Sequence, residues 1–451
     1  MRKRTKTALI ASVGLLLGIA SYWIIGRLPT VISDPDLGTL HLYPAWLHER
    51  GMVYLFSDAG WTEADAQAAV RFARAGQFAV GIDTQRLLTR LDSGTDCVYL
   101  PGSLEGFSRD RQRKAAISAY QEPALLGHGM GATLVYLAQV QAPPLSFNAA
   151  VARDPTPELP LRQAFCNLTP AAKSLRSQTV KVEPPNDAVP LLMWADSMAA
   201  SGSRNFVARA NDKHAPSFVS NGSLYEGYAA ALDRIGAAAP SSTVSDLPLV
   251  EVEPAQSTRS EFAIIYSGDG GWRDLDQTLA GILADKGMPV VGVDMLRYYW
   301  HEVTPDRGAA DLARIVRYYQ SRWHRKQVVL IGFSLGADVL PFLVNRLPAD
   351  VRDDVRLISL LSPSRTTAFE VDPTNWLGYQ STRGEHPIEP EFKLLPKKVV
   401  QCIYGADESD DSLCTLPVAR GMQVLRKPGG HHFDYQYDKL ADEILVAASQ
   451  K

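Results

Sequence analysis

A serine between two glycines is the residue of this 451-residue chain best suited to chemistry. Ser334 lies in the pattern Gly-x-Ser-x-Gly, directly after the apolar run 328–331. Where a strand turns sharply into a helix at such a serine, the hydroxyl is exposed and the flanking glycines let the backbone turn. We therefore predict a strand that ends near residue 331, a helix that starts near residue 335, and a nucleophilic role for Ser334.

A serine nucleophile needs a base, and the base needs an orienting acid. In hydrolases with this turn, the acid and the histidine follow the serine in that order. The run 398–404 predicts a strand, and the loop after it carries acids at positions 407, 408, 410 and 411. We favour Asp411 as the orienting acid, because the step into the next segment fits the usual pattern. Asp407 is the alternative.

Two adjacent histidines, His431 and His432, follow on a glycine-rich loop that leaves room for an imidazole to approach the serine. Gly-His and His-Phe are both frequent at the base position, so the pair leaves the choice open, with a slight preference for His431. Adjacent histidines without a third ligand at helical spacing make a poor zinc site. We expect neither a metal nor an organic cofactor.

The oxyanion of an acyl transfer needs backbone N–H donors, one of them on the residue after the nucleophile. Leu335 supplies that amide. The second is expected from the glycine-rich loop 267–272, which follows a predicted strand over 262–266, with Asp269 or Gly270 as the donor. The loop lacks the Gly-Lys-Ser/Thr ending of a phosphate-binding loop, so we do not expect a nucleotide site.

The N-terminal half of the chain repeats the pattern of the C-terminal half without its nucleophile. Gly129 stands where the serine would be, so this copy cannot run the same chemistry. Repetition at this length indicates two tandem domains rather than a short-period solenoid. The parallel segments are 52–61 with 262–272, 79–83 with 290–294, and 124–132 with 330–337.

Short β-branched runs alternate with helical stretches in both halves, which predicts an α/β fold with mostly parallel sheets. We expect two tandem α/β-hydrolase-like domains, the N-terminal copy being degenerate. The expected divisions are a signal peptide or membrane anchor over 1–30, the degenerate domain over 40–236, a linker over 237–260 and the catalytic domain over 261–451.

A basic start followed by the apolar run 8–25 indicates an export signal or a single membrane anchor, and the sequence does not decide between them. The four cysteines fit an oxidising compartment. Since they divide two per half, we predict the pairs Cys97–Cys166 and Cys402–Cys414. A net charge of only −3 gives no reason to expect a nucleic-acid partner.

The segment from 262 to 435 resembles the AcvB/VirJ family of exported bacterial proteins. The resemblance rests on the motifs 268–272, 292–300, 332–342, 402–405 and 430–433. The degenerate N-terminal half is similar to the long AcvB form, since the short VirJ form lacks it. This resemblance implies a periplasmic hydrolase that removes the aminoacyl group from lysyl-phosphatidylglycerol, with Ser334 as nucleophile. It also implies a link to virulence and to envelope lipid homeostasis.

A lysyl substrate carries cationic amines, so acids near the site would help to bind it. Asp269, Asp294 and Glu302 are candidates, and Trp300 could rest on the lipid surface or stack on an ammonium group. The expected partner is therefore an aminoacylated phospholipid at the membrane surface. Two alternatives stay open: a non-catalytic adaptor or chaperone that contacts secretion-system proteins, and a lipase or thioesterase of other specificity. The retained order of serine, acid and histidine favours the esterase.

Overall fold

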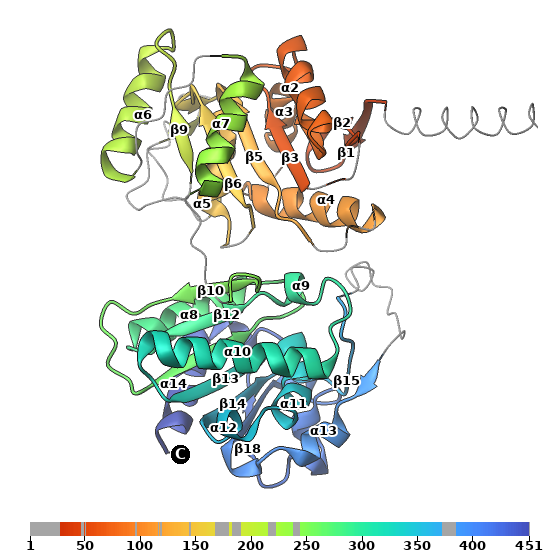
Figure 1. Ribbon diagram of the computed structural model, residues 1–451, viewed down its shortest axis with the longest axis vertical. Helices are drawn as coiled ribbons and strands as arrows, with labels where there is room; N and C mark the ends of the chain where they lie inside the picture. Colours follow the sequence, from red (N-terminus) through yellow and green to blue (C-terminus); the bar gives the residue numbers. More distant parts are fainter. Residues whose placement is uncertain are drawn as a thin grey trace, which may run out of the picture. The chain divides into compact units, whose positions relative to one another are not determined.

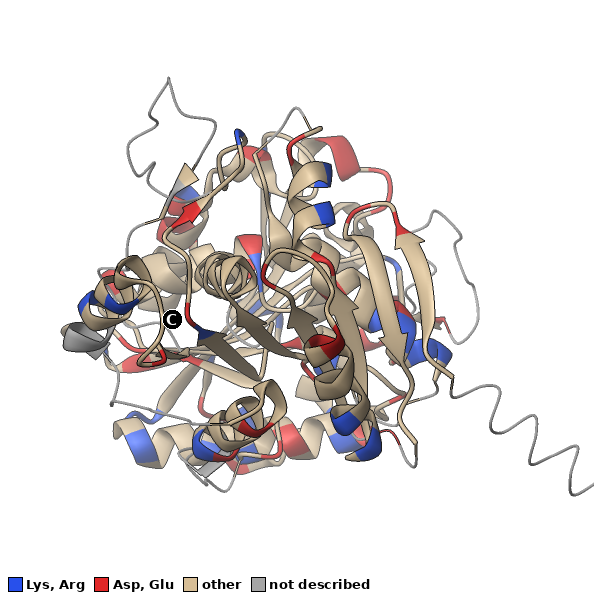
Figure 2. Ribbon diagram, turned by 90° about the horizontal axis from the view of Figure 1, so that it is seen from above, with Lys and Arg blue, Asp and Glu red and all other residues tan. Residues whose placement is uncertain are grey.

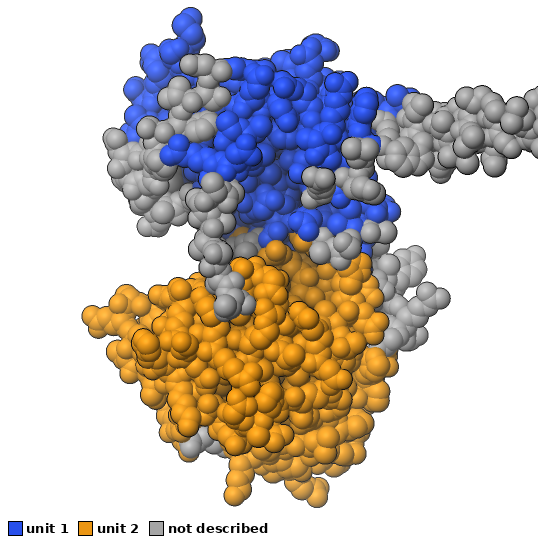
Figure 3. Space-filling view, viewed as in Figure 1, with its two compact units in different colours: residues 1–117, 121–142, 146–239 blue, residues 118–120, 143–145, 240–451 orange. Residues whose placement is uncertain are grey.

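The computed structural model describes residues 28–46, 49, 51–94, 97–115, 117, 120–143, 146–166, 180–182, 191–214, 222–237, 244–371 and 385–450. The chain divides into two compact units (Figure 3). Unit 1 comprises residues 1–117, 121–142 and 146–239, and unit 2 comprises 118–120, 143–145 and 240–451. Most of the predicted export segment lies outside the described residues. None of the helices that are described is long and apolar enough to cross a membrane.

Unit 2 is built on a seven-stranded sheet in the order β10-β12-β11-β13-β14-β17-β18 (Figure 1). Only β10 at the edge runs antiparallel to its neighbour. The strands are β10 (Leu249–Val252), β11 (Glu261–Tyr266), β12 (Val290–Val293), β13 (Gln327–Phe333), β14 (Val355–Leu361), β17 (Val400–Gly405) and β18 (Gln423–Lys427). The main helices are α8 (Asp274–Asp285), α9 (Met295–Tyr298), α10 (Pro305–Trp323), α11 (Leu335–Asn345), α12 (Ala349–Arg352), α13 (Glu389–Leu394) and α14 (Tyr437–Gln450).

Helices cover both faces of this sheet, which explains why its central strands are apolar without alternation. Along β13, Val328 and Leu330 belong to a core shared with α10 and α11. Val329 and Ile331 belong to a second core shared with α8 and α14. Because the sheet is sealed on both sides, chemistry can take place only at the ends of the strands.

Unit 1 has a seven-stranded sheet in the order β1-β2-β4-β3-β5-β6-β9. The strands are β1 (Thr30–Asp34), β2 (Gly38–Tyr43), β3 (Gly51–Phe56), β4 (Gln77–Ile82), β5 (Ala124–His128), β6 (Ala149–Arg153) and β9 (Leu192–Trp194). The helices are α2 (Glu63–Arg74), α3 (Thr84–Leu91), α4 (Leu100–Lys114), α5 (Met130–Gln141), α6 (Ser201–His214) and α7 (Leu224–Ala237). The six strands β2-β4-β3-β5-β6-β9 of this sheet follow one another in the same chain order as the six strands β10-β12-β11-β13-β14-β17 of unit 2.

The two units also share local packing. A Cβ atom placed on Gly81 would lie 2.1 Å from the ring of Trp61, and one placed on Gly292 would lie 2.1 Å from the ring of Trp272. In each unit a tryptophan from the loop after one strand, β3 or β11, therefore covers a glycine on the strand that follows it in the chain, β4 or β12. The predicted repeat and the predicted fold class, two tandem α/β-hydrolase-like domains with mostly parallel sheets, are confirmed.

The element boundaries differ from the expected divisions in two places. The range 237–260, expected as a linker, contains β10, which pairs with β12 and forms the edge of the second sheet. Unit 1 already begins its sheet with β1 at Thr30 rather than near residue 40. Both are edge strands, and β10 is only four residues long within a stretch rich in Pro, Ser and Ala. Because these edge strands are mostly not buried, their sequences contain few consecutive apolar residues, and composition alone did not predict them.

Both predicted disulfides are present, Cys97–Cys166 in unit 1 and Cys402–Cys414 in unit 2. Cys402 lies in β17 and Cys414 follows the acidic loop, so the second bond closes that loop at its base. Acidic and basic residues are interspersed along the described helices and loops (Figure 2), in line with the small net charge of −3.

Candidate active site

Ser334 lies on a sharp turn between β13 and α11, as the sequence predicts. Its backbone has φ 52° and ψ −120°, in the left-handed region that side chains other than glycine rarely occupy. The side chain is half-buried. Strain of this kind persists only where the surrounding structure holds it, and it is common at nucleophile positions.

The two glycines of the motif are required by close backbone contacts. A Cβ atom on Gly332 would lie 2.5 Å from the carbonyl carbon of Gly336, and one on Gly336 would lie 2.0 Å from the carbonyl oxygen of Tyr266. The Gly336 N–H donates to the carbonyl of Ser267 at 3.1 Å. The start of α11 is thus pressed against the end of β11, which brings the loop after β11 beside Ser334.

An acid–histidine pair follows β17, but the acid is not one that the sequence predicts. Nδ1 of His431 lies 2.7 Å from Oε1 of Glu408, and 36% and 31% of the two side chains are exposed. In the described chain, the side chains of Asp407 and Asp411 form no hydrogen bond or ion pair with either histidine, and both are exposed. The structure thus adds Glu408 as a candidate orienting acid beside the predicted Asp411 and Asp407.

The reason lies in the turn after β17. A short 3₁₀ helix, η3 (Ala406–Glu408), directly follows the strand, and Glu408 is its last residue. Asp411 lies beyond this turn, with its N–H bonded to the carbonyl of Glu408 at 3.2 Å. In the sequence, the available signal was how far each acid lies from the end of the strand. Four of the five positions 407–411 are acidic, so the chemistry of the residues did not distinguish between them.

His432 has a different environment from His431. Its Nδ1 lies 3.2 Å from the hydroxyl of Tyr437, and its ring stacks on Tyr435. Burial, reinforced by the neighbouring His431, lowers the pKa of His432 below its usual value. Among the described residues, His431 has a carboxylate partner and His432 has none, so the geometry favours His431 as the base.

Both imidazoles pack on Phe333, the residue before the nucleophile. The ring centroid of Phe333 lies 5.0 Å from that of His431 and 5.5 Å from that of His432. Within the described residues, the hydroxyl of Ser334 makes no hydrogen bond to either imidazole. In hydrolases without substrate this bond is often long and shortens on binding. The serine and the histidine loop are therefore neighbours through Phe333.

The predicted oxyanion donors border the nucleophile. Leu335 is the first residue of α11, and its N–H donates no hydrogen bond within the described chain. A Cβ atom on Gly268 would lie 3.6 Å from the Cβ of Ser334, which places the loop carrying Asp269 and Gly270 next to the serine. A hydrogen bond from the Gly268 backbone to the buried Asp276 holds this loop, and burial raises the pKa of Asp276 well above its usual value.

Two of the candidates for lysyl recognition on and beside α9 are buried, and the third is exposed. Trp300 is 1% exposed and packs in the core, so it cannot rest on a lipid surface. Asp294 is 5% exposed and caps α9 by accepting the N–H of Arg297 at 3.1 Å. Asp83 caps α3 of unit 1 in the same way, which indicates a structural role in both units. Glu302 is exposed.

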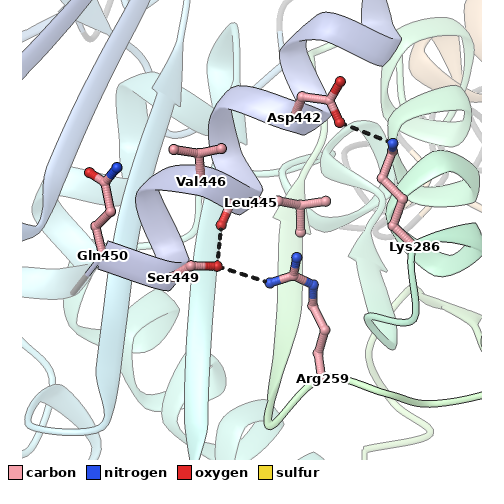
Figure 4. A pocket seen from close by; sticks show the side chains of 7 residues that line it. All are labelled: Arg259, Lys286, Asp442, Leu445, Val446, Ser449 and Gln450. Carbon is pink, nitrogen blue, oxygen red and sulfur yellow. Dashed lines mark hydrogen bonds and ion pairs between the residues drawn. The ribbon is translucent and has the colours of Figure 1, made fainter.

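A hollow of about 500 Å³ lies at the opposite end of the sheet, around the amino end of β11 and the end of α14 (Figure 4). Its cationic groups are already paired: Lys286 with Asp442 at 3.0 Å, and Arg259 with Glu261 at 3.1 Å. Since β11 and β13 are parallel, this hollow and Ser334 lie at opposite ends of the strands. It does not contribute to the site.

The equivalent turn in unit 1 keeps its shape without a nucleophile. Gly129 has φ 59° and ψ −126°, close to the values of Ser334. The Asp58 carboxylate accepts the N–H of Met130 at 2.8 Å. Met130 is the counterpart of Leu335. In unit 1, therefore, the backbone N–H that would donate to an oxyanion already donates to a carboxylate of the same chain.

Comparison with known proteins finds a similarity between unit 2 and one protein family. Residues 260–451 match the family described as bacterial virulence protein (VirJ). A comparison with curated proteins finds no match to this chain.

Three solved structures show the range of structural similarity. Est1E from Butyrivibrio proteoclasticus with bound ferulic acid is 14% identical, covering 46% of this chain and 96% of that one with a TM-score of 0.34. Proline iminopeptidase from Mycobacterium smegmatis is 12% identical, with 45% and 95% covered and a TM-score of 0.32. XC6422 from Xanthomonas campestris, titled an α/β serine hydrolase without lid, is 15% identical, with 45% and 88% covered and a TM-score of 0.30. Function must therefore be inferred from the site itself.

Proposed function

Starting from the match of residues 260–451 to the VirJ family, we propose that this protein is an exported serine esterase. Its substrate is the aminoacyl ester of lysyl-phosphatidylglycerol, and its products are lysine and phosphatidylglycerol. The observation that supports the chemistry is the backbone of Ser334, which has a positive φ at the turn directly after β13. This turn lies next to the histidine loop, in which Nδ1 of His431 is 2.7 Å from Oε1 of Glu408. The lipid substrate comes from the family resemblance.

The first half of the reaction is acyl transfer to the enzyme. Ser334 Oγ attacks the ester carbonyl carbon, and Nε2 of His431 takes the hydroxyl proton. Glu408 accepts the Nδ1–H of the same ring, which fixes the tautomer and stabilises the imidazolium. The protonated ring then gives its proton to the departing glycerol oxygen, and phosphatidylglycerol leaves.

The negative charge on the carbonyl oxygen is held by backbone donors. The N–H of Leu335 is available at the start of α11, where the helix dipole also favours negative charge. The loop that carries Asp269 and Gly270 supplies the second amide. Water, activated by His431, then hydrolyses the aminoacyl-enzyme and releases lysine.

The proposed location is the periplasm. Two disulfides and the absence of free cysteines in the described chain fit an oxidising compartment. The basic and apolar start of the sequence supplies the export segment. An ester at the membrane surface is then on the same side as the enzyme, and no nucleotide or metal chemistry is needed for its hydrolysis.

The decisive experiment uses the protein without residues 1–27, produced so that both disulfides form. Wild type and Ser334→Ala are incubated with vesicles that contain lysyl-phosphatidylglycerol, and free lysine is measured. Ser412→Ala is a control for serine replacement, since Ser412 is a buried turn residue whose hydroxyl bonds the N–H of Cys414. We expect lysine release by wild type and by the control, and none by Ser334→Ala.

Other results separate the alternatives. Hydrolysis of simple esters without lysine release would keep the serine mechanism and reject the lipid, in favour of a lipase or thioesterase. If no ester is cleaved, and Ser334 does not react with a fluorophosphonate, the esterase is rejected in favour of an adaptor for a secretion system.

A further inference from the structure

A buried carboxyl group lies one helical turn after the nucleophile. The N–H of Asp338 donates to the carbonyl of Ser334 at 3.0 Å. Asp338 therefore lies in the first turn of α11, which begins directly after Ser334. Only 6% of Asp338 is exposed. This acid was not among the residues that the sequence suggested.

Asp338 is hydrogen-bonded to both the backbone and the side chain of Ser364, but it has no cation partner in the described chain. Its Oδ1 accepts the N–H of Ser364 at 2.6 Å. In the described part of the chain, no lysine, arginine or histidine forms an ion pair with it. Burial raises the pKa of Asp338 to about 8, and the charge of nearby Asp269 on the oxyanion loop adds to this. Without a cation the buried group therefore holds its proton near pH 7, and an opposite charge bound beside it would favour the carboxylate.

Unit 1 allows a comparison, because its chain follows the same path at this place. Asp154 after β6 and Ser362 after β14 have φ values of 53° and 52°. The N–H of each donates to the next strand, β9 or β17. Thr156 and Ser364 each lie two residues further along, so they occupy equivalent positions.

The inert unit makes the same connection with a neutral side chain. Thr133, four residues after Gly129, donates its hydroxyl to the carbonyl of Thr156 at 2.6 Å. Its counterparts are Asp338 and Ser364. Joining the helix to this loop therefore does not require a charge. The unit that keeps the nucleophile is the one that carries an acid here.

A buried hydroxyl group, that of Ser362, lies at the end of the strand next to the nucleophile. Ser362 is 4% exposed, and its Oγ has no hydrogen-bond partner among the described residues. The N–H of Ser334 donates to the carbonyl of Leu361, so Ser362 directly follows the residue bonded to the nucleophile. Buried hydroxyl groups are normally hydrogen-bonded, which points to a polar group that the chain itself does not supply.

We propose that Asp338 and the hydroxyl of Ser362 form a subsite for the α-ammonium group of an aminoacyl ester. The inference rests on the proposed function and names the feature of the acyl group that is selected. The α-nitrogen is two bonds from the carbonyl carbon that Ser334 attacks, so its recognition site must lie close to the nucleophile. Asp269, on the loop that borders Ser334, adds negative charge to the same region.

The test uses four esters of one chromogenic alcohol, with lysine, norleucine, 6-aminohexanoate and hexanoate as the acids. They differ only in the α-amino and ε-amino groups. We expect wild type to cleave the lysine and norleucine esters with a kcat/KM about 10–100-fold above that of the esters without an α-amino group, as for one charged hydrogen bond. In Asp338→Asn this preference should fall to about 1–3-fold, mainly through KM.

The asparagine keeps an oxygen for the N–H of Ser364, so the loop connection is preserved. Asp410→Asn, at an exposed acid on the loop after β17, is the matched control and should keep the preference. An equal loss on the hexanoate and norleucine esters in Asp338→Asn would make Asp338 a positioning residue and overturn the subsite. A wild type without any preference for the α-amino group would also overturn it.

The hydrolase and the subsite can fail separately. If wild type cleaves the hexanoate ester and Ser334→Ala does not, the proposed serine hydrolysis is supported, whether or not the enzyme prefers esters with an α-amino group. Binding provides a readout without turnover: norleucine amide should bind Ser334→Ala more tightly than hexanamide, and additional Asp338→Asn should remove the difference. Equal binding of the two amides would contradict the subsite even in an inactive protein.

Discussion

The carboxylate of Asp58 fills the space that a side chain on Gly129 would need. A Cβ atom on Gly129 would lie 2.0 Å from Asp58 Oδ1, and this oxygen also accepts the N–H of Met130. Unit 1 has therefore lost more than its nucleophile, because its oxyanion amide is bonded within the chain. Restoring a serine at this turn would not restore a site.

Exchanging the residues at the two turns should have opposite effects on stability. Gly129→Ser is expected to destabilise unit 1 by about 2–4 kcal/mol, since the new side chain meets Asp58. Ser334→Gly should leave unit 2 as stable or slightly more stable, since glycine accepts φ 52° without strain, while abolishing hydrolysis. Chemical denaturation of both variants measures this. An unchanged stability of Gly129→Ser would disprove the steric account, and Asp58→Gly in the same chain should relieve the loss.

Glu408 should be the one acid of its loop on which turnover depends. Glu408→Gln removes the charge beside His431, and we expect kcat/KM on a simple ester to fall by about 10²–10⁴-fold. Asp407→Asn and Asp411→Asn are matched controls and should stay within about threefold of wild type. A large loss in Asp411→Asn together with an active Glu408→Gln would restore the original preference for Asp411.

The two histidines should separate in the same assay. His431→Gln is expected to lose about 10³-fold or more in kcat. His432→Gln should keep most of its activity, because His432 contacts the hydroxyl of Tyr437 rather than a carboxylate. The measurement is kcat on a soluble ester, with circular dichroism to show that both variants fold. A reversed order would assign the base to His432.

Asp338 should reduce stability as the pH rises. Its pKa is raised from 3.8 to about 8, so between these values the folded protein holds a proton that the unfolded chain releases. Stability is then lost progressively as pH increases through this range. Asp338→Asn should be more stable than wild type by an amount on the order of 2–5 kcal/mol at pH 8.5, and by little at pH 4. Urea unfolding at the two pH values tests this; a pH-independent difference would be inconsistent with it.

The Cys402–Cys414 bond should matter for activity as well as for stability, because it closes the loop that carries Glu408. Replacing both cysteines with alanine should cost about 3 kcal/mol and lower kcat. The matched variant without Cys97 and Cys166 should lose stability in unit 1 and leave kcat largely unchanged. If both double variants had the same kcat, the bond would have no role in holding the loop.

Much of the site could be predicted from local sequence. The turn at Ser334, the strand before it and the helix after it follow from one contiguous pattern, and the repeat pointed to an inert copy at Gly129. The orienting acid could not be chosen in this way, since Asp407, Glu408 and Asp411 are chemically similar neighbours. The sequence also does not tell whether the side chain of Trp300 points to the surface or to the core, whereas in the fold it is 1% exposed.

The sequence by itself determined the fold class, the strand-to-helix turn that carries Ser334 and the two cysteine pairs. Each of these depends on periodicity, on steric limits within a few residues, or on how many partners exist in each half. Only the tertiary structure decided that Glu408 contacts His431, that Asp58 occupies the vacant turn of unit 1, and that Asp338 is buried beside Ser334. These choices depend on the directions of side chains from segments far apart in the chain, and those directions are fixed only when the sheets and helices pack.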